Sequence, residues 1–137
     1  MTFKQFALDK RIIHAIKLAG YTTPTPIQSQ SIAKILDGYD VMGLAQTGTG
    51  KTAAFTLPIL QHLLKGPKQQ LRALIIAPTR ELAEQIHLTT VELGKGTNLR
   101  SLAIYGGVSK NSQISKLRKG VNIAIACPGR LLDLVGD

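Results

Sequence analysis

The residues best suited to chemistry in this sequence form one glycine-rich segment, residues 45–52, with the sequence AQTGTGKT. Gly48 and Gly50 carry no Cβ, so the backbone around them can turn tightly and approach a bulky anion. The first N–H groups of a following helix have no intrahelical partner and can bind that anion. Lys51 adds a positive charge for the β- and γ-phosphates, and the Thr52 hydroxyl can ligate a Mg²⁺ ion that bridges them. The segment, called the phosphate loop below, therefore predicts a site for nucleotide phosphates.

Every residue of the phosphate loop belongs to the predicted nucleotide site. These residues are Ala45, Gln46, Thr47, Gly48, Thr49, Gly50, Lys51 and Thr52, and we expect catalytic roles for Lys51 and Thr52. The usual pattern begins with glycine, and Ala45 stands in that place. Because that position faces no phosphate, alanine should be tolerated. The alternative is a surface loop that happens to contain two glycines and a lysine, but Lys-Thr directly after the second glycine favours phosphate binding.

The apolar pattern predicts the elements that position this loop. Strands are expected near 41–45, 72–77, 100–104 and 122–126, and helices near 51–64, 80–94, 109–119 and 130–135. Short, nearly continuous apolar runs such as 73–77 are typical of strands covered on both faces. Strand–helix alternation with short links indicates an α/β fold, with a parallel sheet flanked by helices.

Four loops follow the predicted strands. They are the phosphate loop, Pro78-Thr79-Arg80, Gly106-Gly107 and Cys127-Pro128-Gly129-Arg130. In a parallel sheet the carboxyl ends of the strands share one edge, where ligands bind. Arg80 and Arg130 can each make forked contacts to a phosphate. The alternative for each of the last three loops is an ordinary helix cap or a tight turn.

Residues 1–39 are predicted to form a separate region, an arm followed by two helices, ahead of the region 40–137. Asp9 should cap a helix that runs to about Ala19, and Thr25-Pro26 should begin a second helix that ends at Gly38. Between them, Tyr21 could stack on a base, and the amide of Gln28 could pair with an adenine edge. Taken alone, Gln28 is more simply a solvated polar residue.

The composition indicates a globular protein with an affinity for polyanions. Lysine and arginine number 17 against 8 acidic residues, a net charge of +9, and no acidic residue occurs between Glu92 and Asp133. Such a one-signed stretch attracts nucleic acid, although a solvated basic face explains it equally well. The single cysteine, Cys127, excludes an internal disulfide, and no apolar run is long enough for a membrane span. The cytoplasm is the expected location.

Five motifs, in this order, resemble those of the DEAD-box RNA helicases, and most closely those of a bacterial member. They are Tyr21-x-x-Pro24-x-x-x-Gln28, the phosphate loop, Pro78-Thr79-Arg80-Glu81-Leu82-Ala83, Gly106-Gly107 and Pro128-Gly129-Arg130. The resemblance covers nearly the whole chain. It implies a RecA-like domain, ATP and Mg²⁺ as ligands, and the RNA sugar-phosphate backbone as a sequence-independent partner.

The resemblance also implies roles for individual positions. Tyr21, Thr23 and Gln28 are expected at the adenine, with Phe3 packed behind the aromatic ring. The residues expected to grip the RNA backbone are Pro78, Thr79, Arg80, Gly107, Gly129 and Arg130. The family usually has threonine before Pro-Gly-Arg, so Cys127 lacks a hydroxyl that would reach a phosphate.

Other parts of the family pattern do not occur in residues 1–137, among them Asp-Glu-Ala-Asp, Ser-Ala-Thr and a second RecA-like domain. The resemblance therefore implies the front part of a first RecA-like domain, truncated before the Asp-Glu-Ala-Asp strand. Alone, it should bind nucleotide weakly and not hydrolyse it. In a longer protein, hydrolysis would be coupled to local RNA unwinding. A cut sheet edge could let this piece self-associate. The alternatives are a DNA-directed helicase of the same superfamily and a non-hydrolysing nucleotide- or RNA-binding module.

Overall fold

The computed structural model describes residues 1–136, so Asp137, the last residue of the predicted second region, lies outside them. The chain divides into two compact units. The first unit contains residues 1–65 and 92–98, and the second contains residues 66–91 and those from Leu99 onward. The predicted boundary after residue 39 falls inside the first unit and stays a prediction.

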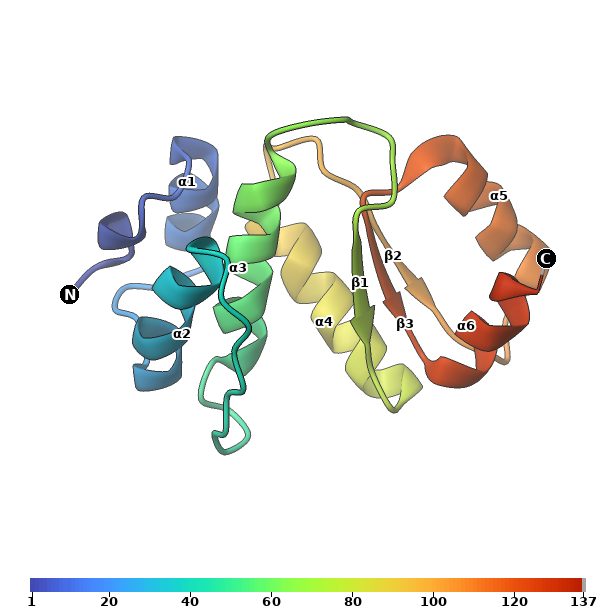
Figure 1. Ribbon diagram of the computed structural model, residues 1–137, viewed down its shortest axis with the longest axis horizontal. Coiled ribbons are helices and arrows are strands. Elements are labelled where there is room, and N and C mark those ends of the chain that lie inside the picture. Colours follow the sequence, from blue (N-terminus) through green and yellow to red (C-terminus); the bar gives the residue numbers. More distant parts are fainter. Residues whose placement is uncertain (137) are drawn as a thin grey trace. The chain divides into compact units, whose positions relative to one another are not determined.

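The first unit contains a 3₁₀ helix, η1 (Phe3–Phe6), and three α-helices, α1 (Lys10–Leu18), α2 (Pro26–Leu36) and α3 (Lys51–Leu63) (Figure 1). The predicted caps at the starts of α1 and α2 are confirmed. The Asp9 carboxylate accepts a hydrogen bond from the Arg11 N–H, and the Thr25 hydroxyl accepts one from the Gln28 N–H. Side-chain oxygens at these positions satisfy N–H groups that have no intrahelical partner.

Apolar side chains from each of these helices form the core of the first unit. Its most deeply buried members include Ile12, Ile32, Leu57 and Leu60. Spacing of three to four residues places such side chains on one face of each helix. Phe3 and Phe6 of η1 are also buried, which docks the predicted arm.

The second unit contains the sheet. Strands β1 (Ala73–Ile76), β2 (Ser101–Ile104) and β3 (Ile123–Ala126) are parallel and lie in the order β1-β3-β2 (Figure 1). Ile76 and Ile104 both pair with Ala126, so the three strands end level with one another. The predicted α/β fold with a parallel sheet is confirmed.

Helices cover both faces of this sheet. Helices α5 (Lys110–Gly120) and α6 (Pro128–Val135) lie on one side of it, and α4 (Arg80–Leu93) begins on the other (Figure 1). Ala124 and Ala126 of β3 pack with Leu102 and Ile104 against leucines of α5 and α6. Leu74 and Ile76 of β1 share that face by register but remain about half exposed, at 52% and 51%.

A buried asparagine lies at the beginning of the sheet. Asn122 is 4% exposed. Its Nδ2 donates to the Gln70 carbonyl (3.3 Å), and its Oδ1 accepts from the Arg100 N–H (2.9 Å). One side chain thereby connects the segments that lead into all three strands.

The strand predicted near 41–45 is absent, so that prediction was wrong. Residues 41–46 have no regular structure, and Met42 and Leu44 are 89% and 87% exposed. An extended segment forms a strand only when its N–H and C=O groups pair with a neighbour, and the described residues of this unit include no other strand. Gly43 instead lies against α2, where an added Cβ would be 3.2 Å from Ile27 Cδ1.

The remaining predicted elements are confirmed with small shifts at their ends. Helix α6 begins at Pro128, two residues before the predicted start, because proline suits the first helical position. Helix α2 ends at Leu36, before the predicted Gly38. In residues 1–136, no helix combines the length and the apolar character needed to cross a membrane.

Candidate functional site

The phosphate loop is an exposed turn that leads directly into α3. Gly48 and Gly50 have φ angles of 84° and 85°, a left-handed conformation that favours glycine. Gly50 occupies the cap position of α3, and no side chain caps this helix. The first turn of α3 also contains no acidic residue. The start of a 13-residue helix therefore presents backbone N–H groups and the positive end of its dipole to the loop, as an anion site requires.

Lys51 lies across this loop. Its exposed Nζ donates a hydrogen bond to the Ala45 carbonyl at 2.7 Å, and the Thr49 hydroxyl donates to the Gln46 carbonyl at 2.6 Å. A phosphate in the loop would replace the Ala45 carbonyl as the partner of the ammonium group. Thr52 is half-buried in the first turn of α3, where its hydroxyl suits a metal–phosphate complex. Within residues 1–136, no cluster of three or more His, Cys, Asp or Glu could hold a metal ion.

Gln28 connects α2 to the phosphate loop. Its side-chain Oε1 accepts from the Thr25 N–H at 2.9 Å, and its Nε2 donates to the Gly50 carbonyl at 3.1 Å. The residue is 2% exposed, so the alternative of a solvated polar residue is wrong. The first of these bonds completes a capping box with Thr25. Contact with an adenine edge stays a prediction, and the amide retains one N–H and one lone pair for it.

The predicted aromatic of this site, Tyr21, lies in the connector between α1 and α2. Its ring packs against Phe3, with centroids 6.2 Å apart, which confirms the predicted packing. Burial, more than the nearby charge of Glu92, raises the pKa of the Tyr21 phenol. Thr23 is exposed two residues further on.

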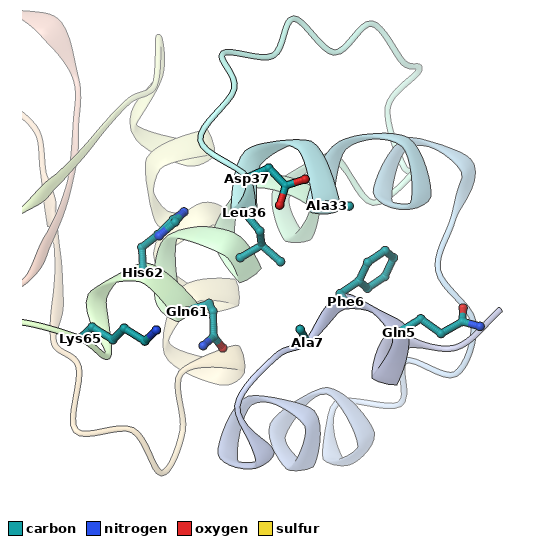
Figure 2. A pocket seen from close by; sticks show the side chains of 9 residues that line it. All are labelled: Gln5, Phe6, Ala7, Ala33, Leu36, Asp37, Gln61, His62 and Lys65. Carbon is teal, nitrogen blue, oxygen red and sulfur yellow. The ribbon is translucent and has the colours of Figure 1, made fainter.

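A separate pocket of about 420 Å³ lies among η1, α2 and α3 (Figure 2). Its lining residues are Gln5, Phe6, Ala7, Ala33, Leu36, Asp37, Gln61, His62 and Lys65. Gln61 accepts a hydrogen bond from the Asp9 N–H at 2.6 Å, and His62 Nε2 lies 3.3 Å from the Ile35 carbonyl. The first contact joins the cap residue of α1 to α3, and the second joins α3 to α2. None of the predicted site residues is among those that line this pocket.

In the second unit, three predicted loops share one edge. The segments 77–80, 105–108 and 127–130 follow β1, β2 and β3, which end level, and we call them the strand-end edge. Backbone bonds from Ala77 to Ala126 (3.0 Å) and from Cys127 to Ile104 (2.8 Å) extend the pairing into this edge. The prediction that these loops gather is confirmed. The phosphate loop belongs to the first unit, and its place on the same edge stays a prediction.

The first segment of the strand-end edge carries Arg80. Pro78, Thr79 and Arg80 are exposed, and the Thr79 hydroxyl accepts from the Leu82 N–H (3.2 Å) at the start of α4. The Arg80 guanidinium carbon lies 4.7 Å from the centroid of the Tyr105 ring. Gly107 has a φ of 85°, and a Cβ there would be 3.4 Å from Arg80 Nη1. The arginine is therefore placed between an aromatic ring and a glycine.

Arg130 differs from Arg80 because its side chain is only 13% exposed. Its Nη1 donates to Gln113 Oε1 at 2.9 Å, and both Nη atoms lie 3.2 Å from the Val108 carbonyl. Its Nε lies 3.8 Å from an Asp133 carboxylate oxygen. Arg130 thus supports the loop that contains Gly107. Direct phosphate contact by Arg130 or by the exposed Gly129 stays a prediction.

Sequence reasoning missed two residues of this edge, Tyr105 and Gln113. The Tyr105 hydroxyl donates to Glu84 Oε1 (2.7 Å), and the Tyr105 carbonyl accepts from Gln113 Nε2 (3.0 Å). The Glu84 hydrogen bond is the main cause that raises the pKa of the Tyr105 phenol. Tyr105 could have been found from its position, because it directly precedes Gly106-Gly107 in one of the predicted strand-end loops. Gln113 has no comparable signal.

A family model described as DEAD/DEAH box helicase matches residues 25–137. Together with the parallel α/β unit and the phosphate loop, this match shows that the chain belongs to the DEAD/DEAH box helicase family.

Three relatives illustrate the similarity. The chain is 47% identical over 137 residues to an "ATP-dependent RNA helicase DBP3" of Lodderomyces elongisporus, covering 100% of this chain and 25% of that protein. It is 46% identical over 138 residues to an "ATP-dependent RNA helicase DDX42" of Xenopus laevis, covering 98% of this chain and 15% of that protein. It is 44% identical to a "DEAD-box ATP-dependent RNA helicase 24" of Arabidopsis thaliana, covering 98% and 18%.

The chain thus spans a quarter or less of the length of these relatives. None of the three organisms is a bacterium, so these relatives give no support to the prediction of a bacterial member. The predicted cytoplasmic location stays a prediction.

Proposed function

We propose that this chain is the ATP-binding and RNA-binding part of an ATP-dependent RNA helicase. The proposal of nucleotide binding rests on one observation, the start of α3. No side chain caps this helix, the left-handed glycines Gly48 and Gly50 precede it, and Lys51 lies at the loop. Family membership and the names of the relatives support ATP as the nucleotide and RNA as the nucleic acid.

In this proposal the phosphate loop, residues 45–52, holds the triphosphate. The N–H groups at the start of α3 bind phosphate oxygens, and Lys51 turns from the Ala45 carbonyl to the β- and γ-phosphates. The Thr52 hydroxyl ligates Mg²⁺, which when bound neutralises charge on those phosphates. Tyr21, Thr23 and Gln28 receive the adenine. Because Gln28 already bonds the Gly50 carbonyl, its adenine contact would be linked directly to the loop.

The strand-end edge binds the RNA backbone in this proposal. Its predicted contacts are Pro78, Thr79, Arg80, Gly107, Gly129 and Arg130. Contacts to phosphates and sugars carry little sequence information and weaken as salt rises. The unbroken absence of acidic residues between Glu92 and Asp133 favours such a polyanion partner.

By itself this chain should bind nucleotide without hydrolysing it. Asp-Glu-Ala-Asp does not occur in residues 1–137, so this chain offers no acidic pair for the metal or for the attacking water. Hydrolysis coupled to local duplex unwinding, and closure with a second RecA-like domain, are proposals for a longer protein. Self-association through a sheet edge remains a proposal for this chain.

Replacement of Lys51 by alanine tests the nucleotide half. Binding of a fluorescent ATP analogue with Mg²⁺ should weaken by about tenfold or more, which corresponds to roughly 1.4 kcal/mol of binding free energy. Lys17→Ala removes the same charge from an exposed position near the end of α1 and should leave binding unchanged. ATP turnover by the 137-residue chain that disappears in Lys51→Ala would contradict the proposal of a non-hydrolysing part.

Matched RNA and DNA duplexes test the nucleic-acid half. The intact protein should unwind the RNA duplex in the presence of ATP and leave the DNA duplex paired. Unwinding of the DNA duplex alone would establish the DNA-directed alternative.

A further inference from the structure

We propose that Tyr105 and Gln113 are positioning residues that hold Arg80 and Arg130 as one phosphate-binding unit at the strand-end edge. This inference rests on the proposed RNA-backbone contact of the two arginines. Neither Tyr105 nor Gln113 belongs to the motifs that indicated the function.

Tyr105 orients Arg80. Its ring lies beneath the Arg80 guanidinium, 4.7 Å from centroid to Cζ, where the negative face of the ring attracts the cation. The far end of the ring is anchored over α4, because its hydroxyl donates to Glu84 Oε1 at 2.7 Å. Glu84 and Arg80 both belong to α4, so the tyrosine connects the loop after β2 to the start of that helix at two points.

Gln113 orients Arg130 and the same loop. It is 5% exposed on α5, and both ends of its amide are used. Nε2 donates to the Tyr105 carbonyl at 3.0 Å, and Oε1 accepts from Arg130 Nη1 at 2.9 Å. Arg130 then donates to the Val108 carbonyl three residues after Tyr105. A continuous series of contacts therefore runs from Arg80 to Arg130 through one ring and one amide.

Such a series affects binding because arginine is a flexible side chain. The side chain has many rotamers, and ordering it on contact with RNA reduces affinity. Contacts that order the guanidinium beforehand reduce that cost, which is the general benefit of preorganisation. Gly107 lies beside this guanidinium in a left-handed conformation, with a φ of 85°, which favours glycine.

A double-mutant cycle tests the role of Tyr105. The probe is a fluorescently labelled single-stranded oligouridine, and the variants of the intact protein are Arg80→Ala, Tyr105→Leu and the two combined. Tyr105→Leu should weaken RNA binding about threefold to fivefold. In the Arg80→Ala background it should cause little further loss, because its effect acts through the arginine. Tyr105→Phe keeps the ring face but loses the bond to Glu84, so its affinity should lie between those of the wild type and Tyr105→Leu.

The salt dependence separates positioning from general destabilisation. For single strands, the slope of log affinity against log salt changes by roughly 0.7 for each phosphate that the protein no longer neutralises. Tyr105→Leu and Arg80→Ala should reduce the slope by similar amounts. Binding of the fluorescent ATP analogue should be unchanged in both variants. Where Tyr105→Leu lowers the unfolding temperature, Tyr105→Met keeps an apolar side chain without a ring face and takes its place in the cycle.

Gln113→Glu tests the second positioning residue. The carboxylate still accepts from Arg130 but, when ionised, cannot donate to the Tyr105 carbonyl. RNA affinity should fall while binding of the fluorescent ATP analogue stays unchanged, and the unfolding temperature should fall because the Tyr105 carbonyl loses its donor. An affinity equal to that of the wild type would overturn the role of Gln113.

The outcomes distinguish this inference from the proposed function. If Arg80→Ala leaves RNA affinity and salt slope unchanged, the proposed RNA contact itself is wrong. If Arg80→Ala weakens binding but Tyr105→Leu or Tyr105→Met does not, or if the two losses simply add, the RNA contact stands and the positioning role of Tyr105 is overturned.

Discussion

The buried amide of Gln28 donates a hydrogen bond to the carbonyl of Gly50, although the two residues lie 22 positions apart in the sequence. Gly50 is the residue from which α3 begins, and Gln28 is also fixed to the Thr25 N–H at the start of α2. One side chain therefore sets the beginnings of two helices. Any change at Gln28 must alter both the packing of α2 and the shape of the phosphate loop.

Replacement of Gln28 by leucine should lower both stability and nucleotide affinity. The Thr25 N–H would lose its partner, and the Gly50 carbonyl would keep only the Ala54 N–H. An unsatisfied buried polar group costs about 1–3 kcal/mol. Urea denaturation should show a lower free energy of unfolding, and the fluorescent ATP analogue should bind more weakly. Gln30→Leu, at an exposed position on the same helix, is the control and should change neither. Unchanged stability in Gln28→Leu would mean that the two bonds contribute nothing.

Replacement of Gly50 by alanine should be more costly than the same change at Gly20. Both glycines have positive φ angles, +85° and +86°, so both substitutions carry a backbone penalty of about 1–2 kcal/mol. A Cβ at Gly20 would meet no atom within 4 Å, whereas one at Gly50 would overlap the Gln28 amide nitrogen and approach Thr25 Oγ1 at 3.1 Å. Denaturation should therefore rank Gly50→Ala as less stable than Gly20→Ala, and only Gly50→Ala should lose nucleotide affinity. Equal losses of stability would show that the contact with Gln28 is easily relieved.

His87 should make the stability of the protein depend on pH near neutrality. Burial is the main cause that lowers its pKa below the ordinary 6.5, with Lys116 acting in the same direction and Glu84 opposing it. The neutral ring lies with Nδ1 3.1 Å from Ser101 Oγ. Because the unfolded chain binds the proton more readily, this contribution is fully present above pH 6.5 and is lost as pH falls from there through the folded-state pKa.

Urea denaturation at a series of pH values measures this effect. His87→Gln should remove part of the decrease in unfolding free energy between about pH 7.5 and pH 5. His14→Gln, at an exposed position on α1, should leave the profile as in the wild type. If His87→Gln retains the full pH dependence, another group is responsible for it.

Local signals made most of the fold predictable. Asp9 and Thr25 have the side-chain chemistry that caps helices, and the apolar runs at 73–77 and 121–126 have the length of buried strands. The shared edge of the loops after β1, β2 and β3 followed from the alternation of strands and helices, which indicates a parallel sheet. These features depend on neighbours in the sequence, so the sequence contains them directly.

The errors and omissions concern partners distant in the sequence. The run at 41–45 is as apolar as a buried strand, but strand formation depends on a paired neighbour that the sequence does not specify. Gln28 was interpreted through its possible ligand or as a solvated polar residue, although Thr25 three residues earlier forms the pattern of a capping box. The connection from Tyr105 through Gln113 to Arg130 joins three separate elements, and no single segment reveals it.

Asn122 has a consequence for the opposite end of the sheet. Strand pairs can slip, and a slip of one residue would move every side chain of a strand to the other face. By binding the Gln70 carbonyl and the Arg100 N–H, this amide sets β1 and β2 at a common starting point relative to β3. All three strands are four residues long, so a common start produces a common finish. The hydrogen bonds of Asn122 at the start of the strands therefore align the loops at their other end, which carry Arg80, Gly107 and Arg130.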